Sequence, residues 1–143
     1  MKNKKLLSSK LDHVNFSAKS VEETIQFYEE LFDFQIVEKG SRVSGPYAIM
    51  KNGSSMICFS ENNEKNAVPD KFNGALHINH FALSIDDEGE FEKRLELLKP
   101  ARSIQDPVDY PFSTSWYVLD PNGHEIEVVK WHESQPKFPV SKL

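Results

Sequence analysis

The 143-residue chain has little cysteine, no large cluster of basic residues and no long hydrophobic run. Its single cysteine, Cys58, cannot form a disulfide within the chain, which suits a reducing compartment. No segment approaches the roughly 20 apolar residues of a membrane-spanning helix, and the basic N-terminus lacks the apolar run of a signal peptide. These absences predict a cytoplasmic protein that neither spans nor inserts into a membrane.

The charge balance excludes another class of partner. The formal net charge is −5, and the basic residues cluster only in the short run Lys2–Lys5, so the electrostatic footprint of a nucleic-acid-binding protein is missing. At 38% hydrophobic and 11% aromatic, a chain of this length can bury one core and is expected to form one domain.

The sequence of the first half predicts one strand, then a helix, then three strands. Residues 11–18 alternate, with an apolar face and a polar face that carries His13, Asn15 and Ser17. Ser20 and Glu23 form a capping box for a helix over 21–32. Strands are expected at 34–38, 47–51 and 56–60, with a loop at 39–46 and an Asn52-Gly53 turn. The predicted order is βαβββ.

The same order returns in the second half. Residues 78–85 alternate with His80 on the polar side, and Asp87 with Glu90 begins a helix over 88–98. A short strand at 102–104 and a loop at 105–114 come next, before strands 115–119 and 126–131 on either side of the Asn122-Gly123 turn.

Two sequence matches indicate that the halves are duplicates. His13–Ala18 resembles His80–Ile85 at an offset of 67, and Tyr47–Gly53 resembles Tyr117–Gly123 at an offset of 70. Two matches at nearly one offset favour a duplicated module whose polar faces converge on one pseudo-twofold cleft.

Three side chains on the polar faces of these strands form a candidate metal site. His13 and His80 occupy equivalent strand positions, and Glu127 looks away from the apolar face of the last strand. Two histidines and one carboxylate hold a divalent metal such as Fe, Mn, Zn or Ni, while leaving positions open for a substrate. The alternative for each histidine alone is an ordinary structural or surface residue.

These segments resemble the vicinal oxygen chelate superfamily, which includes glyoxalase I, fosfomycin-resistance enzymes, bleomycin-binding proteins and extradiol dioxygenases. The resemblance lies in residues 11–16, 24–32, 79–85 and 116–128 and covers about residues 10–131. It implies an α+β fold in which two βαβββ modules, about 10–60 and 77–131, form an incompletely closed eight-stranded, barrel-like sheet with the helices outside. It also implies metal ligands at His13, His80 and Glu127 and a homodimer, with residues 132–143 as a C-terminal tail.

The resemblance leaves the reaction open among lyase, thiol transferase and dioxygenase. Cys58 stands where glyoxalase I carries a fourth ligand, a glutamate, and we favour packing over ligation for this thiol. The cysteine-bearing strand and the Ser115-Trp116-Tyr117 run resemble fosfomycin-resistance transferases. However, Asn15 replaces their threonine, and the loop 105–114 lacks their lysine and potassium-site pattern.

The function expected is a metal-dependent enzyme that acts on a small oxygen-chelating or electrophilic molecule, with the metal as Lewis acid. Tyr117 is the candidate catalytic hydroxyl, although packing under the loop 105–114 is an equal alternative for it. Asn15, Cys58 and Ser115 are expected to line the substrate pocket. The alternative function is metal-free binding of a small molecule, as in bleomycin-resistance proteins.

Overall fold

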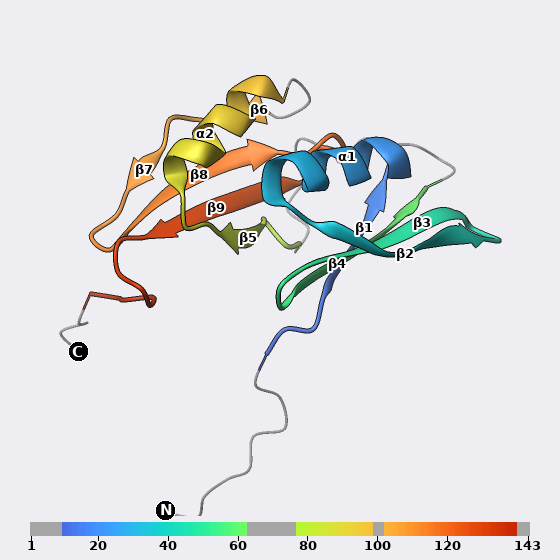
Figure 1. The fold of residues 1–143 in the computed structure, drawn as a ribbon, viewed down its shortest axis with the longest axis horizontal. Coiled ribbons are helices and arrows are strands. Elements are labelled where there is room, and N and C mark those ends of the chain that lie inside the picture. The colour runs from blue at the N-terminus through green and yellow to red at the C-terminus, as the bar shows by residue number, and fades with distance from the viewer. Residues whose placement is uncertain (1–9, 63–76, 99–101, 140–143) are drawn as a thin grey trace, which may run out of the picture.

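The computed structural model describes residues 10–62, 77–98 and 102–139 (Figure 1). The first module runs through one helix and four strands: β1 (Val14–Ala18), α1 (Val21–Phe32), β2 (Gln35–Arg42), β3 (Gly45–Asn52) and β4 (Ser55–Glu61). The second module repeats this order with one additional short strand, β7: β5 (Phe81–Ser84), α2 (Glu88–Leu97), β6 (Arg102–Ser103), β7 (Val108–Asp109), β8 (Ser113–Leu119) and β9 (Glu125–Trp131). The two predicted modules are therefore confirmed.

Each module forms its own sheet. The strand order is β1-β4-β3-β2 in the first sheet and β5-β9-β8-β6 in the second, where β7 also pairs with β8. In both modules the first strand lies parallel to the last, and the other neighbours are antiparallel. The prediction of an incompletely closed arrangement holds, but the strands divide between two open sheets (Figure 1).

Both helices begin where their capping residues predict. The Ser20 hydroxyl accepts a hydrogen bond from the Glu23 amide, and the Asp87 carboxylate accepts one from the Glu90 amide, so each satisfies an amide of the first turn. Helix α1 ends at Asp33, which adopts a left-handed conformation with φ of 56°. None of the helices in the described ranges is long and apolar enough to cross a membrane.

Two predicted boundaries were wrong. The expected loop 39–46 is instead part of a long β2–β3 hairpin, in which Arg42 pairs with Gly45. Gly45 has φ of 127°, which lets the chain reverse tightly and extend the ladder through polar residues that show no periodic signal. The expected loop 105–114 contains β7, because Val108 and Asp109 pair with β8.

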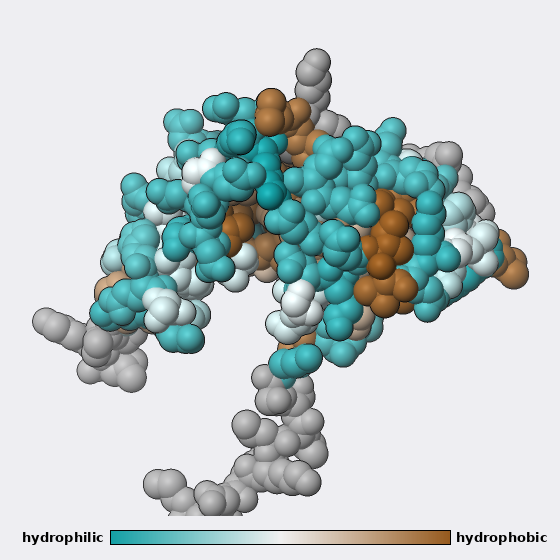
Figure 2. Space-filling model, viewed as in Figure 1, coloured by the Kyte–Doolittle hydropathy of each residue, from teal (hydrophilic) through white to brown (hydrophobic). Residues whose placement is uncertain are grey.

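The core lies between the helices and one face of each sheet. Its members share almost complete burial; the largest are Phe27, Tyr28, Phe34, Met50, Ile57, Phe59 and Ile126. Both helices lie on the same side of the sheets, with α1 against α2 (Figure 1). The opposite faces of the sheets carry the polar side chains that alternate with the core residues along each strand. The visible surface of the molecule is mainly hydrophilic, with a few hydrophobic patches (Figure 2).

A buried polar network in the β8–β9 loop ties the second module to the first. Asn122 accepts a hydrogen bond from the Lys19 amide at 2.7 Å and donates to the Thr24 hydroxyl at 3.1 Å. Asp120 accepts from the Tyr28 hydroxyl at 3.3 Å and from the His124 amide at 2.8 Å. Asp120, Asn122, Thr24 and Tyr28 are all buried, so this loop holds the relative position of the halves without water.

We expect Asn122→Ala to destabilise the fold by about 2–4 kcal/mol, because it removes both bonds to the first module and leaves buried partners unsatisfied. Urea unfolding checks this. The matched control is Asn52→Ala in the other hairpin turn, where the exposed Asn52 amide binds only the Phe32 carbonyl of its own module. The control should cost less than about 1 kcal/mol. Equal losses would show that the loop does not join the modules.

Candidate functional site

The polar face of the second sheet carries a cluster centred on Glu127. The ladder register places Glu127 between Ala82 of β5 and Tyr117 of β8. Its neighbours Ile126 and Val128 point into the core and are fully buried, so the strand alternation turns the carboxylate to the open face. Its side chain is 20% exposed, so solvent and a ligand can reach it.

His80 lies beside this carboxylate. It immediately precedes β5, and its Nε2 is 3.0 Å from Glu127 Oε2. The other ring nitrogen, Nδ1, faces Glu125 Oε1 at 3.9 Å, which is beyond hydrogen-bond distance but within the range of an ion pair. The structure thus brings two of the three predicted ligands together with their donor atoms facing each other.

Two hydroxyl groups contact the second oxygen of Glu127, and a third hydroxyl contacts one of these two. Ser115 donates to Oε1 at 2.7 Å, and the Tyr117 hydroxyl lies 3.4 Å from the same oxygen. The Tyr110 hydroxyl is 3.1 Å from that of Tyr117. A carboxylate can only accept, so Tyr117 donates in its contact with Glu127, and in the contact between the two tyrosines either hydroxyl can be the donor.

The environment keeps Tyr117 protonated. Its pKa lies well above the usual tyrosine value, first because of the hydrogen bond with Tyr110, then because of burial and the negative charge of Glu127. A tyrosine with a raised pKa donates a hydrogen bond at neutral pH and does not act as a base. The Tyr117 ring also stands edge-on to His80, with centroids 6.0 Å apart.

His13 occupies the corresponding position on the first sheet. It immediately precedes β1 and is exposed, and its Nδ1 is 2.7 Å from the Asp12 carboxylate. This contact orients the ring and leaves Nε2 for another partner, as carboxylates do for histidines that bind metals. Asn15 and Cys58 are paired neighbours on the same polar face.

The registers of the two sheets define which residues are equivalent. Asn15 pairs with Cys58, and Ala82, at the equivalent position 67 residues later, pairs with Glu127. Cys58 is thus the counterpart of Glu127. Since Ile49 faces Cys58 and Tyr117 faces Glu127, the counterpart of Tyr117 is Ile49. The sequence match, which aligned Tyr47 with Tyr117 at an offset of 70, therefore differs by two residues from the alignment that the structure gives.

Within the described part of one chain, no group of three histidine, cysteine or acidic side chains converges as a metal site. His80 and Glu127 are together on the second sheet, whereas His13 and Cys58 belong to the first. Burial, followed by the Asp12 charge, raises the pKa of the Cys58 thiol against the lowering effect of Arg42. A raised pKa disfavours the thiolate that a metal requires, which supports the packing interpretation.

Residues 10–128 match the family model of the Glyoxalase/Bleomycin resistance protein/Dioxygenase superfamily. The chain belongs to this superfamily. Metallothiol transferase FosB of Staphylococcus epidermidis is 29% identical over 121 residues, which cover 82% of this chain and 79% of FosB.

Solved structures of superfamily proteins share the fold. A glyoxalase family protein from Enterococcus faecalis has a TM-score of 0.73 at 20% identity, covering 87% of this chain and 99% of that one. The fosfomycin resistance protein FosX from Listeria monocytogenes has a TM-score of 0.67 at 19% identity, covering 87% and 94%.

Three residues of the candidate site were not predicted from the sequence. Asp12 precedes its histidine directly and could have been noticed as its partner. Glu125 lies on the polar face of β9, but nothing in the sequence distinguishes it from an ordinary solvent-exposed glutamate. Tyr110 lies in the expected loop 105–114, and only the β7–β8 pairing, with the Tyr110 amide bonded to the Ser113 carbonyl, brings its hydroxyl to Tyr117.

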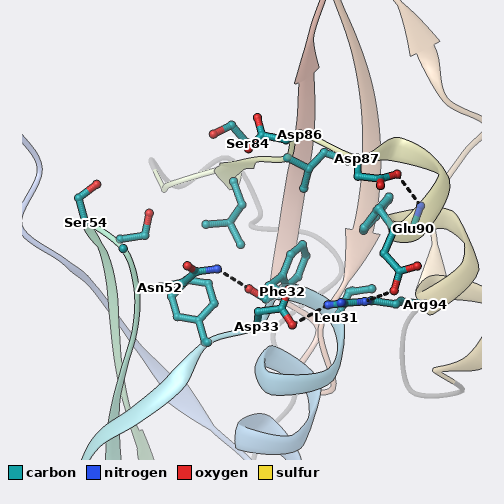
Figure 3. Close-up of a pocket in the computed structure, with 16 residues that line it drawn as sticks. Leu31, Phe32, Asp33, Asn52, Ser54, Ser84, Asp86, Asp87, Glu90 and Arg94 are labelled. Atoms are coloured by element: carbon teal, nitrogen blue, oxygen red, sulfur yellow. Dashed lines mark hydrogen bonds and ion pairs between the residues drawn. The ribbon is translucent and has the colours of Figure 1, made fainter. Parts of the chain in front are cut away.

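A pocket of about 480 Å³ lies elsewhere, on the helix side of the sheets (Figure 3). The pocket lies between the β3–β4 turn and the start of α2. Arg94 forms part of its wall and makes ion pairs with Asp33 and Glu90. None of the proposed ligands lines this pocket, so it is distinct from the candidate site.

We expect Tyr110→Phe to lower the pKa of Tyr117 toward the usual tyrosine value, because the hydrogen bond that raises it most is lost. An NMR titration of carbon-labelled tyrosine rings checks this. Tyr47, whose pKa is raised first by its bond with Glu38, is the internal control and should not change. An unchanged Tyr117 titration would show that the two hydroxyls do not interact in solution.

Proposed function

We propose that this protein is a divalent-metal-dependent enzyme that acts on a small molecule with metal-chelating oxygens, and that His13, His80 and Glu127 hold the metal. The observation that carries the proposal is the pair of donor atoms His80 Nε2 and Glu127 Oε2, which face each other at 3.0 Å on an accessible sheet face. Imidazole and carboxylate ligands suit Mn, Fe, Zn and Ni.

The surroundings of these residues fit a metal site. Ser115 fixes the Glu127 carboxylate and Asp12 orients His13, which are the supporting contacts that metal ligands need. A FosX variant from Listeria monocytogenes, 19% identical and with a TM-score of 0.67, is described in complex with Mn(II) and 1S,2S-dihydroxypropylphosphonic acid. This supports a divalent metal and a small oxygen-rich substrate for the present chain.

A bound metal would supply Lewis acidity toward the chelated oxygens of the substrate. Ser115 holds Glu127 in place, and the Tyr117 hydroxyl lies close enough to donate to a substrate oxygen beside Glu127. Because its pKa is raised, Tyr117 acts as a hydrogen-bond donor that stabilises developing negative charge. Asn15 and Cys58 lie on the face of the first sheet that would form the opposite wall.

We further propose that the enzyme is a homodimer in which His13 of the partner subunit completes the site. His80 and Glu127 supply two ligands, and the described residues of one chain supply no third at the same point. His13 is accessible on the first sheet, in the position equivalent to His80. A twofold axis that places the first sheet of one protomer over the second sheet of its partner creates two identical sites.

The first test is Glu127→Gln, which keeps the size and the hydrogen-bonding capacity of the side chain but removes its charge. We expect loss of the metal and of turnover in assays with hemithioacetals, with epoxides and a thiol, and with catechols. Glu125→Gln is the matched control on the same strand face and should retain the metal. Turnover by metal-free Glu127→Gln would refute the mechanism, and tight ligand binding without turnover by the wild type would favour sequestration.

The second test is complementation between inactive variants. If the ligands come from two chains, refolding His13→Ala together with Glu127→Gln creates mixed dimers with one intact site each, or about a quarter of the wild-type sites under random pairing. Metal content and turnover should return to that level, while each variant alone has neither. No recovery in a mixture that forms mixed dimers would place all three ligands in one chain.

A further inference from the structure

An arginine stacked on a tyrosine stands on the polar face of the first sheet. The Arg42 guanidinium carbon lies 4.0 Å from the centre of the Tyr47 ring. The register places Arg42, Tyr47 and Cys58 on one face, because Tyr47 and Ile49 share a parity and Ile49 pairs with Cys58. This is the face that carries Asn15 and His13, opposite to the core residues Ala48, Met50, Ile57 and Phe59.

Two contacts hold the Tyr47 ring beneath this guanidinium. The Tyr47 hydroxyl donates to Glu38, which fixes one end of the ring. The ring lies across Gly40, where an added Cβ would come within 3.1 Å of Tyr47 Cε1 and 3.2 Å of its hydroxyl. A side chain at position 40 would require the ring to shift by a few tenths of an ångström, so Gly40 allows the close approach of Tyr47 beneath Arg42.

Among residues 10–62, 77–98 and 102–139, no carboxylate lies within ion-pair distance of Arg42, whereas Arg94 contacts both Asp33 and Glu90. The positive charge of Arg42 reaches the middle of the sheet face, where it acts to lower the pKa of Cys58. A guanidinium has five N–H donors, and stacking on a ring leaves its edge available to an acceptor.

We propose that Arg42 binds an anionic group of the substrate, a carboxylate or a phosphonate, through a two-pronged hydrogen bond. The inference rests on the proposed function only for the position of this face in the substrate cleft. A guanidinium held flat on a ring matches the planar geometry of two anionic oxygens, and its alignment limits the entropy lost on binding. The substrate would therefore carry a negative group in addition to the oxygens that chelate the metal.

The test uses protein freed of metal by a chelator, so that coordination to a metal cannot contribute. Isothermal titration with phenylphosphonate and with benzoate measures binding by the wild type, by Arg42→Gln and by Gly40→Ala. We expect the wild type to bind at least one anion and Arg42→Gln to weaken that binding about tenfold or more. Gly40→Ala keeps the charge but displaces Tyr47, and it should also weaken binding. The preferred anion distinguishes a phosphonate from a carboxylate substrate.

Lys51→Gln is the matched control, because it removes a positive charge from the same polar face of the sheet without changing the Arg42–Tyr47 pair. It should change the affinity less than about twofold. Equal effects of Arg42→Gln and Lys51→Gln, or no binding of either anion by the wild type, would overturn the proposal. The metal content of Arg42→Gln, measured separately, should equal that of the wild type, so failure of the metal site and failure of the arginine site give different results.

Discussion

The structure depends on a small buried polar network, in which Asp120 and Asn122 contact the first strand and helix of the other module. Its bonds to the Lys19 amide, Thr24 and Tyr28 cross from one half of the chain to the other, and the side chains involved are buried. Burial and the Asp120 charge raise the pKa of Tyr28, so its hydroxyl remains a donor. Such a network fixes one relative position of the modules, since any displacement leaves buried polar groups unpaired.

Fixing the modules in this way leaves each sheet with one face on the core and one polar face open. The two open faces differ in their charged groups: the second carries Glu125 and Glu127 around His80, whereas the first carries Arg42 and Lys51 as well as Glu38 and, beside His13, Asp12. Cys58 stands in the place of Glu127, so the first sheet has no carboxylate at that position. The two modules therefore differ at equivalent positions of their polar faces.

Much of the candidate site could be predicted because strand alternation is a local property. The alternation of β9 places Glu125 and Glu127 on the polar face, the match of His13 with His80 marks both histidines, and the resemblance to the superfamily selects Glu127 as the third predicted ligand. Tyr110 could not be found in this way, because its place beside Tyr117 depends on the pairing of β7 with β8 across a loop rich in proline. The long β2–β3 hairpin was missed for a related reason: its residues are almost all exposed, so no hydrophobic period marks it.

The sequence by itself determined the two βαβββ modules, the caps of both helices and the polar parity of His13, Asn15, Ser115, Tyr117 and Glu127. These follow from hydrophobic period and from hydrogen bonds between residues three positions apart. Only the tertiary structure decided which polar residues meet. It placed His80 against Glu127 and left His13 on the other sheet. It also laid Tyr47 across Gly40 beneath Arg42. His80 and Glu127 are 47 positions apart in the sequence, and Arg42, Gly40 and Tyr47 lie on two paired strands of one hairpin, so the geometry of both contacts is set by strand pairing and register.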